Sequence, residues 1–213
     1  PSLAAFDAKT GAEIWRAARK AGSFPVKSSW TTPFVWTNGQ RTEIVTTGQG
    51  AVVSYDLQGR ELWRIGRMSM PTSSPFAVDG LLYVGTGSQG DANRPFYAVK
   101  PGASGDISLK PGENGHEFIV WWHPRAAGYT PSALVHGGRA YLVHDTGILT
   151  LFDAKSGRQI YKVRVGGGGQ MFSASPVGVG PRVLLLTEEG TTFVIDAGPE
   201  YREIGRNALG EMT

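Results

Sequence analysis

An internal repeat is the feature that most constrains the fold of this 213-residue chain. The segment at residues 3–16 recurs at 52–64 and at 149–162, and each copy runs from an apolar stretch through an aspartate and a glycine to an aromatic residue. A weaker copy covers 192–198, and a degraded copy at 96–102 has a lysine in place of the aspartate. Repeats with a period of roughly 40 to 50 residues indicate stacked, structurally equivalent units. The fold should therefore be an array of such units.

A second landmark keeps the same spacing, because a serine or threonine followed by proline opens an apolar run in each unit. Between the two landmarks lies a segment rich in β-branched and aromatic residues, which is typical of a short strand. Each unit then holds four short strands, and this is the composition of a β-propeller blade. The hydroxyl–proline landmarks are Thr32 with Pro33, Ser74 with Pro75, Thr130 with Pro131, and Ser175 with Pro176.

The predicted fold class is all-β, a β-propeller of four-stranded antiparallel blades. Residues 12–21 are rich in helix formers, but the repeat assigns them to a strand, because the equivalent stretches have strand patterns. Residues 102–117 break the period and are expected to be an insertion between the third and fourth strands of their blade. We expect a single domain over 1–213 that is part of a longer propeller, with a half blade at 1–19 and four full blades at about 26–67, 71–124, 128–166 and 170–207.

Composition excludes several classes of protein. The net charge is +3 and only 18% of residues are charged, which argues against a nucleic-acid-binding arm. The chain has no cysteine, so disulfides, cysteine-ligated metals and cysteine nucleophiles are excluded. The longest aliphatic run spans residues 183–186, far below the roughly 20 residues of a membrane-spanning helix.

The pattern Ala-x-Asp-x-x-Thr-Gly-x-x-x-Trp at residues 5–15 resembles the repeat of the pyrroloquinoline-quinone-like (PQQ-like) β-propellers. That group includes quinoprotein dehydrogenases and the lipoprotein propeller that helps to assemble outer-membrane proteins. The segments 101–108 and 122–125 are also similar to uncharacterised bacterial members, a similarity that implies no activity. The aspartate and glycine of each repeat suit a hairpin turn, and the resemblance implies that the aromatic residue packs between blades. The expected turn and docking residues are Asp7, Gly11, Trp15, Asp56, Gly59, Trp63, Asp153, Gly157 and Tyr161.

Catalytic and metal sites are not expected. The resemblance implies that a quinoprotein dehydrogenase would need a catalytic aspartate, a calcium site and often a vicinal cysteine pair, but the cysteines are absent and a hairpin explains each repeat aspartate. The four histidines lack metal-ligand spacing, and no serine lies in a Gly-x-Ser-x-Gly motif. We therefore expect no catalytic residue, no metal and no bound PQQ with calcium. The histidines are His116, His123, His136 and His144.

A binding site is expected where the connections between blades converge on one mouth of the central channel. Aromatic and basic side chains there could hold a peptide or a small ligand. Alternatively, Trp30 and Phe172 simply pack between blades. The candidate residues are Lys27, Trp30, Met70, Thr72, Arg125, Tyr129, Gln170 and Phe172.

These observations favour a non-catalytic PQQ-like propeller that acts as a scaffold for a protein or small-molecule ligand, without nucleic acid as a partner. One alternative is a fragment of a PQQ-dependent dehydrogenase, and another is the sensor propeller of a signalling protein. If the parent protein is exported, as the resemblance implies, it is periplasmic or extracellular. An arc of blades also leaves two sheet faces open, which could allow self-association.

Overall fold

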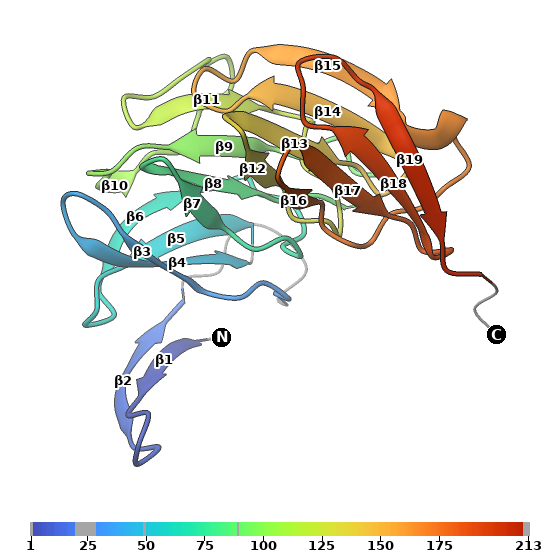
Figure 1. Ribbon diagram of the computed structural model, residues 1–213. Coiled ribbons are helices and arrows are strands. Elements are labelled where there is room, and N and C mark those ends of the chain that lie inside the picture. The colour runs from blue at the N-terminus through green and yellow to red at the C-terminus, as the bar shows by residue number, and fades with distance from the viewer. Residues whose placement is uncertain (1, 20–28, 49, 89, 211–213) are drawn as a thin grey trace.

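The computed structural model describes residues 2–19, 29–48, 50–88 and 90–210, and these residues form β-sheets arranged side by side in an arc (Figure 1). An N-terminal hairpin comes first, and four sheets follow, in each of which the four strands of the blade pair antiparallel in chain order. The first strand of each sheet lies innermost, since β3 contacts β7 and β12 contacts β16 across neighbouring sheets. The expected partial propeller of four-stranded blades is confirmed.

The hairpin and the first two blades account for the N-terminal half of the chain. The hairpin contains β1 (Ser2–Phe6) and β2 (Glu13–Ala18), so residues 13–18 of the stretch rich in helix formers form a strand. Blade 1 contains β3 (Phe34–Thr37), β4 (Thr42–Gly48), β5 (Ala51–Tyr55) and β6 (Glu61–Ile65). Blade 2 contains β7 (Phe76–Val78), β8 (Leu81–Gly85), β9 (Phe96–Val99) and β11 (Ile119–His123).

The last two blades are more regular because they carry no insertion. A short 3-10 turn, η1 (Val165–Gly167), links them. The described residues contain no helix that is long and apolar enough to cross a lipid bilayer. Blade 3 contains β12 (Leu134–His136), β13 (Arg139–Val143), β14 (Ile148–Asp153) and β15 (Gln159–Arg164). Blade 4 contains β16 (Val177–Val179), β17 (Arg182–Leu186), β18 (Thr191–Asp196) and β19 (Glu203–Ala208).

The repeat aspartates close the turns between the third and fourth strands. Asp7 Oδ1 accepts the backbone N–H of Thr10 at 2.7 Å, and Gly11 takes the positive φ of +71° that the turn requires. The turn at Asp56 is one residue shorter, and there Oδ1 accepts the N–H of Arg60 at 2.9 Å. Side-chain capping of this kind fixes the loop, and therefore the register of the two strands that it joins.

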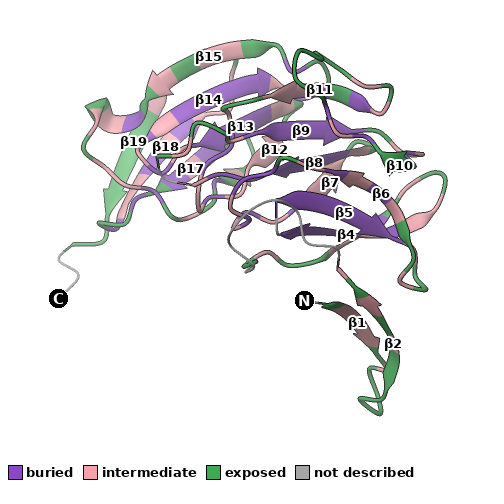
Figure 2. Cartoon of the chain, turned by 180° about the vertical axis from the view of Figure 1, so that it is seen from behind, coloured by how far each residue is buried: buried purple, intermediate pink, exposed green. Residues whose placement is uncertain are grey.

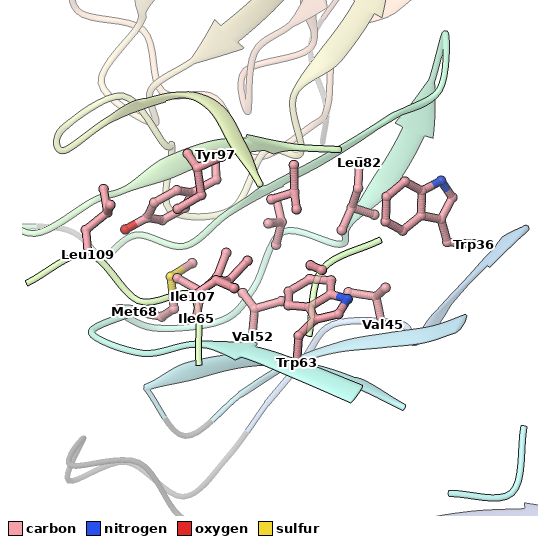
Figure 3. Packing of buried hydrophobic residues seen from close by; sticks show 14 residues of the cluster. Trp36, Val45, Val52, Trp63, Ile65, Met68, Leu82, Tyr97, Ile107 and Leu109 are labelled. Carbon is pink, nitrogen blue, oxygen red and sulfur yellow. The ribbon is translucent and has the colours of Figure 1, made fainter. Parts of the chain in front are cut away.

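The hydrophobic cores lie between blades, because alternate residues of each strand face the neighbouring sheet. Figure 3 shows the core between blades 1 and 2, where Trp63 and Val52 face Leu82 and Tyr97. Equivalent apolar clusters lie between blades 2 and 3 and between blades 3 and 4. Stability is therefore a property of junctions between neighbouring blades as much as of single sheets.

The insertion at 102–117 lies between β9 and β11, as expected, but it also extends blade 1. Its short strand β10 (Gly105–Asp106) pairs parallel with β6, so the first blade has five strands instead of the expected four. Ile107 is fully buried in the core between blades 1 and 2, and the Ser108 hydroxyl accepts the Gly66 N–H at 2.6 Å. This strand covers the outer edge of blade 1, an edge that would otherwise be free to pair with another chain.

Candidate ligand-binding mouth

One end of the arc gathers the connections between blades and the loops between second and third strands. Backbone hydrogen bonds hold these segments together: the N–H of Gly87 donates to Met70 O at 3.1 Å, and the N–H of Phe172 donates to Asp145 O at 2.9 Å. The N–H of Trp30 likewise donates to Pro71 O at 3.1 Å. We call this end the mouth. Its backbone is fixed by bonds between consecutive blades.

A ladder of hydroxyl contacts joins the four blades just before their inner strands. The N–H of Thr32 donates to Ser74 Oγ at 3.1 Å, the N–H of Ser74 to Ser132 Oγ at 3.2 Å, and the N–H of Ser132 to Ser175 Oγ at 2.9 Å. Each of these residues stands two positions before its inner strand. The structural landmark of blade 3 is therefore Ser132 followed by alanine, and the assignment of Thr130 with Pro131 was wrong by two residues.

The predicted mouth residues differ in how far their side chains reach solvent. Trp30 is 59% exposed, and Arg125 is exposed as well. Met70, Thr72, Tyr129 and Gln170 are half-buried, whereas Lys27 lies outside the described residues. Six candidates are thus at least partly accessible to a partner.

Burial limits the contacts that three of the candidates can make with a ligand. Phe172 is 0% exposed and packs on Phe193 with ring centroids 6.3 Å apart, so it packs between blades, as the alternative for this residue stated, and does not contact a ligand. The side-chain oxygens of Thr72 and Gln170 are buried and have no hydrogen-bond partner among the described residues. Phe172 is buried because its connection turns into the core between blades 3 and 4.

The expected docking residues lie at the junctions between blades. Trp15 Nε1 donates to Leu57 O in the turn of blade 1 at 2.8 Å, and a Cβ on Gly59 would lie 2.7 Å from the Trp15 ring. Tyr161 packs edge-on against Tyr201 at 6.0 Å between blades 3 and 4. Gly11 differs, since a Cβ there would meet nothing within 4 Å.

Trp121 is a docking residue that was not among the expected docking residues. It pairs with Ala98 in register, as Trp15 pairs with Ala5. Its Nε1 donates to Ala154 O at 2.8 Å, and its ring lies 2.4 Å from the position of a Cβ on Gly157. The sequence signal was hidden because the aspartate is missing from this repeat and the insertion separates the two strands.

A buried charged cluster at the mouth was also not predicted. His144 Nε2 lies 3.2 Å from Asp145 Oδ1, although neither oxygen of Asp145 has a hydrogen-bond donor among the described residues. Burial lowers the pKa of His144; the Asp145 charge opposes this effect, and the Arg94 charge adds to it. Two nitrogens of Arg94 are also buried without a partner in the described part of the chain. The sequence did not indicate this cluster, because a histidine and an aspartate that follow a strand are usually not fully buried.

Comparison with known proteins agrees with this geometry. A family model described as outer membrane protein assembly factor BamB matches residues 2–107. The chain is built from PQQ-like propeller repeats. No curated protein sequence matches it significantly.

Two solved PQQ-like propellers show how far the likeness extends. BamB from Moraxella catarrhalis is 17% identical with a TM-score of 0.64, over 97% of this chain and 55% of that protein. Quinohemoprotein alcohol dehydrogenase from Comamonas testosteroni is 11% identical with a TM-score of 0.66, over 99% of this chain and 40% of that protein. At such identities the likeness shows the fold alone. The chain spans about half the length of these proteins or less.

The PQQ-like repeat raises the question of whether the quinone and its calcium ion would fit. Calcium takes six to eight oxygen ligands, mostly from carboxylates and carbonyls. The described residues contain no group of three or more His, Cys, Asp or Glu side chains placed to hold a metal ion, and the repeat carboxylates of Asp7 and Asp153 accept hydrogen bonds within their own turns. The described residues therefore do not provide this donor set.

Proposed function

We propose that this PQQ-like arc is a non-catalytic scaffold that binds another protein at the mouth. The observation that carries the proposal is Trp30, whose side chain is 59% exposed while its backbone is held by Pro71 of the next connection. A large aromatic side chain on a fixed backbone loses little conformational entropy on binding. Tryptophan and arginine are also the residue types most enriched at energetic hot spots of protein interfaces.

The family model that matches residues 2–107 supports a protein partner. The matching family model is described as an assembly factor of outer-membrane proteins, and the mouth offers Arg125 and Tyr129 beside an otherwise structural framework. A mouth fixed by backbone bonds is pre-organised, which reduces the entropic cost of binding. We place the protein in an exported compartment, either the periplasm or the cell surface.

Affinity capture from a periplasmic extract tests the proposal. The protein with its native mouth should retain a partner, and the double variant Trp30→Ala, Arg125→Ala should lose most of it. Ile14→Ala is the matched control, because Ile14 is 63% exposed but lies on the hairpin. Equal recovery by the native protein and the mouth variant would disprove binding at this site.

The dehydrogenase alternative needs a separate test. Adding PQQ and calcium to the purified protein should leave the absorbance of the quinone unchanged if the chain has no cofactor site. A saturable spectral change that requires calcium would contradict the non-catalytic assignment.

A further inference from the structure

A groove opens at the end of the arc opposite to the mouth, between blades 3 and 4. It has a volume of about 470 Å³, which lies within the range of roughly 300 to 1,000 Å³ typical of ligand sites. The β12–β13 and β14–β15 turns form one wall, and the β18–β19 turn forms the other. The side chains that define its chemistry are Arg139, Asp153, Lys155, Arg158, Ile160 and Pro199.

The charges in this groove are unbalanced toward positive. Within the described residues, the side chains of Lys155 and Arg158 form neither an ion pair nor a hydrogen bond. Asp153 is the one carboxylate in the lining, and its Oδ1 already accepts the N–H and the hydroxyl of Ser156 at 2.8 and 2.7 Å. On the side of blade 4, Asp196 is paired with Arg202 at 2.7 Å, while Glu200 lines a neighbouring hollow. The basic groups of the groove are thus available to an anion.

Arg139 is held in place to receive that anion. Its Nη1 donates to Gly137 O at 3.2 Å and to Ala197 O at 3.1 Å, so the guanidinium bridges from blade 3 to the backbone of blade 4. Its other N–H groups have no hydrogen-bond partner among the described residues, and a guanidinium matches the geometry of a carboxylate. Lys155 and Arg158 are exposed and can close around a bound group.

A second groove at this end of the arc lacks such a group of basic side chains. The groove between blades 1 and 2, with a volume of about 340 Å³, is lined mainly by apolar and uncharged residues, and Asp79 is its charged member.

We propose that this groove binds an extended acidic segment of a protein partner, with carboxylates on Arg139, Lys155 and Arg158. A free inorganic anion would occupy only a small part of the volume, whereas Ile160 and Pro199 can contact apolar side chains between the carboxylates. Recognition of acidic motifs by clusters of basic residues is a recurrent mode of peptide binding. The inference rests on the proposed function, because it assigns the occupant to a protein partner.

Fluorescence anisotropy with a short fluorescein-labelled peptide of alternating glutamate and leucine tests the proposal. The native protein should bind it saturably, and the Kd should rise with ionic strength because the groups are exposed. The double variant Lys155→Glu, Arg158→Glu should raise the Kd by at least about tenfold. Lys9→Glu is the matched control, because Lys9 holds the position of Lys155 in the turn of the hairpin, and its Kd should equal that of the native protein.

Three outcomes would overturn the proposal: equal affinity of the native protein and the double variant, equal weakening by Lys9→Glu, or displacement of the peptide by inorganic phosphate or a single-stranded oligonucleotide as effectively as by unlabelled peptide. The substituted side chains are exposed, so unchanged thermal unfolding should show that the variants fold. Trp30→Ala separates the two sites. It should reduce partner capture at the mouth and leave peptide binding intact, so either proposal can fail without the other.

Discussion

At the scale of single residues, the buried carboxylate of Glu43 shows how a charged group is accommodated between blades. Glu43 is 0% exposed. Its Oε2 accepts hydrogen bonds from Ser54 Oγ and Trp63 Nε1, both at 2.6 Å, and its Oε1 accepts from Asn38 Nδ2 at 3.1 Å and Arg41 Nε at 3.0 Å. All four partners of Glu43 are hydrogen-bond donors, which suits a carboxylate because both of its oxygens accept. A side chain that itself donates a hydrogen bond would not fit this site.

Glu43→Gln should therefore destabilise the fold. The amide NH₂ of glutamine would face donors, and at least one hydrogen bond would be lost in a buried site, at a cost of about 2 to 4 kcal/mol. Glu13→Gln is the control, because that side chain pairs with Arg16 at the surface and the change should cost less than about 1 kcal/mol. Urea unfolding of both variants measures the difference, and equal midpoints would contradict the assigned role of Glu43.

The repeat aspartates give the protein a defined response to acid. Hydrogen bonds from the side chain and the backbone N–H of Ser156 hold the pKa of Asp153 below its ordinary value. A carboxylate whose pKa is lowered in the folded state contributes its stability above the unfolded pKa of about 3.9, and this stability is lost as the pH falls through the folded pKa.

Asp153→Asn should remove this pH dependence. The free energy of unfolding of the native protein should exceed that of the variant by a margin that is constant at neutral pH and shrinks below about pH 4. Chemical unfolding at a series of pH values measures the margin. If the free energies of unfolding of the two proteins differed by the same amount down to strong acid, the carboxylate of Asp153 would not stabilise the fold through its turn.

At the scale of elements, the junction between two blades depends on a glycine that receives an aromatic ring. Gly157 has a φ of +70° and lies beneath Trp121, whereas Gly11 has a φ of +71° and no neighbour near its Cβ position. The two positions have nearly the same backbone strain and differ in docking. They separate the cost of conformation from the cost of the ring contact.

Gly11→Ala should cost only the conformational term, which is about 1 to 2 kcal/mol. Gly157→Ala should cost this amount plus about 1 to 3 kcal/mol, because the new methyl group would overlap the Trp121 ring. Thermal unfolding of the two variants measures the difference. Equal shifts of Tm for the two variants would show that the Trp121 ring does not pack against Gly157.

The sequence predicted the elements better than their contacts. The aspartate–glycine turns and the hydroxyl landmarks were sufficient to locate the strands, because both depend on local chemistry. The docking of Trp121 on blade 3 and the pairing of β10 with β6 could not be predicted, because each depends on which segments the insertion and the turns bring together in space. The burial of Phe172 was one of two alternatives, and only the contacts of its connection decide between them. Thr130 was chosen as the landmark of blade 3 because a proline follows it. The hydroxyl contacts with Ser74 and Ser175 are instead made by Ser132, two residues later.

At the scale of the whole molecule, the two ends of the arc differ from its middle. Figure 2 shows buried strands in the inner blades and largely exposed residues along β2 and β19. On the free face of blade 4, Val177 pairs in register with Leu184, and Leu184 with Val194. The equivalent row on blade 3 is covered by its neighbour, whereas Val177 is 56% exposed. An apolar row of this kind favours association.

We therefore expect the protein to self-associate in a concentration-dependent manner. Val177→Lys together with Val179→Lys should shift sedimentation toward the monomer without lowering Tm, since both side chains are exposed. Leu57→Lys, at an exposed position in a turn of blade 1, should leave association unchanged. A native protein that sediments as a monomer at every concentration would refute association through blade 4.

The insertion strand β10 bears on the order in which the protein is made. Because β10 pairs with β6, a nascent chain leaving the ribosome cannot finish blade 1 until most of blade 2 has been synthesised. Until then, the edge of β6 is open to other unfinished chains. Translation that pauses just before Gly105 should prolong this exposure and increase misfolding.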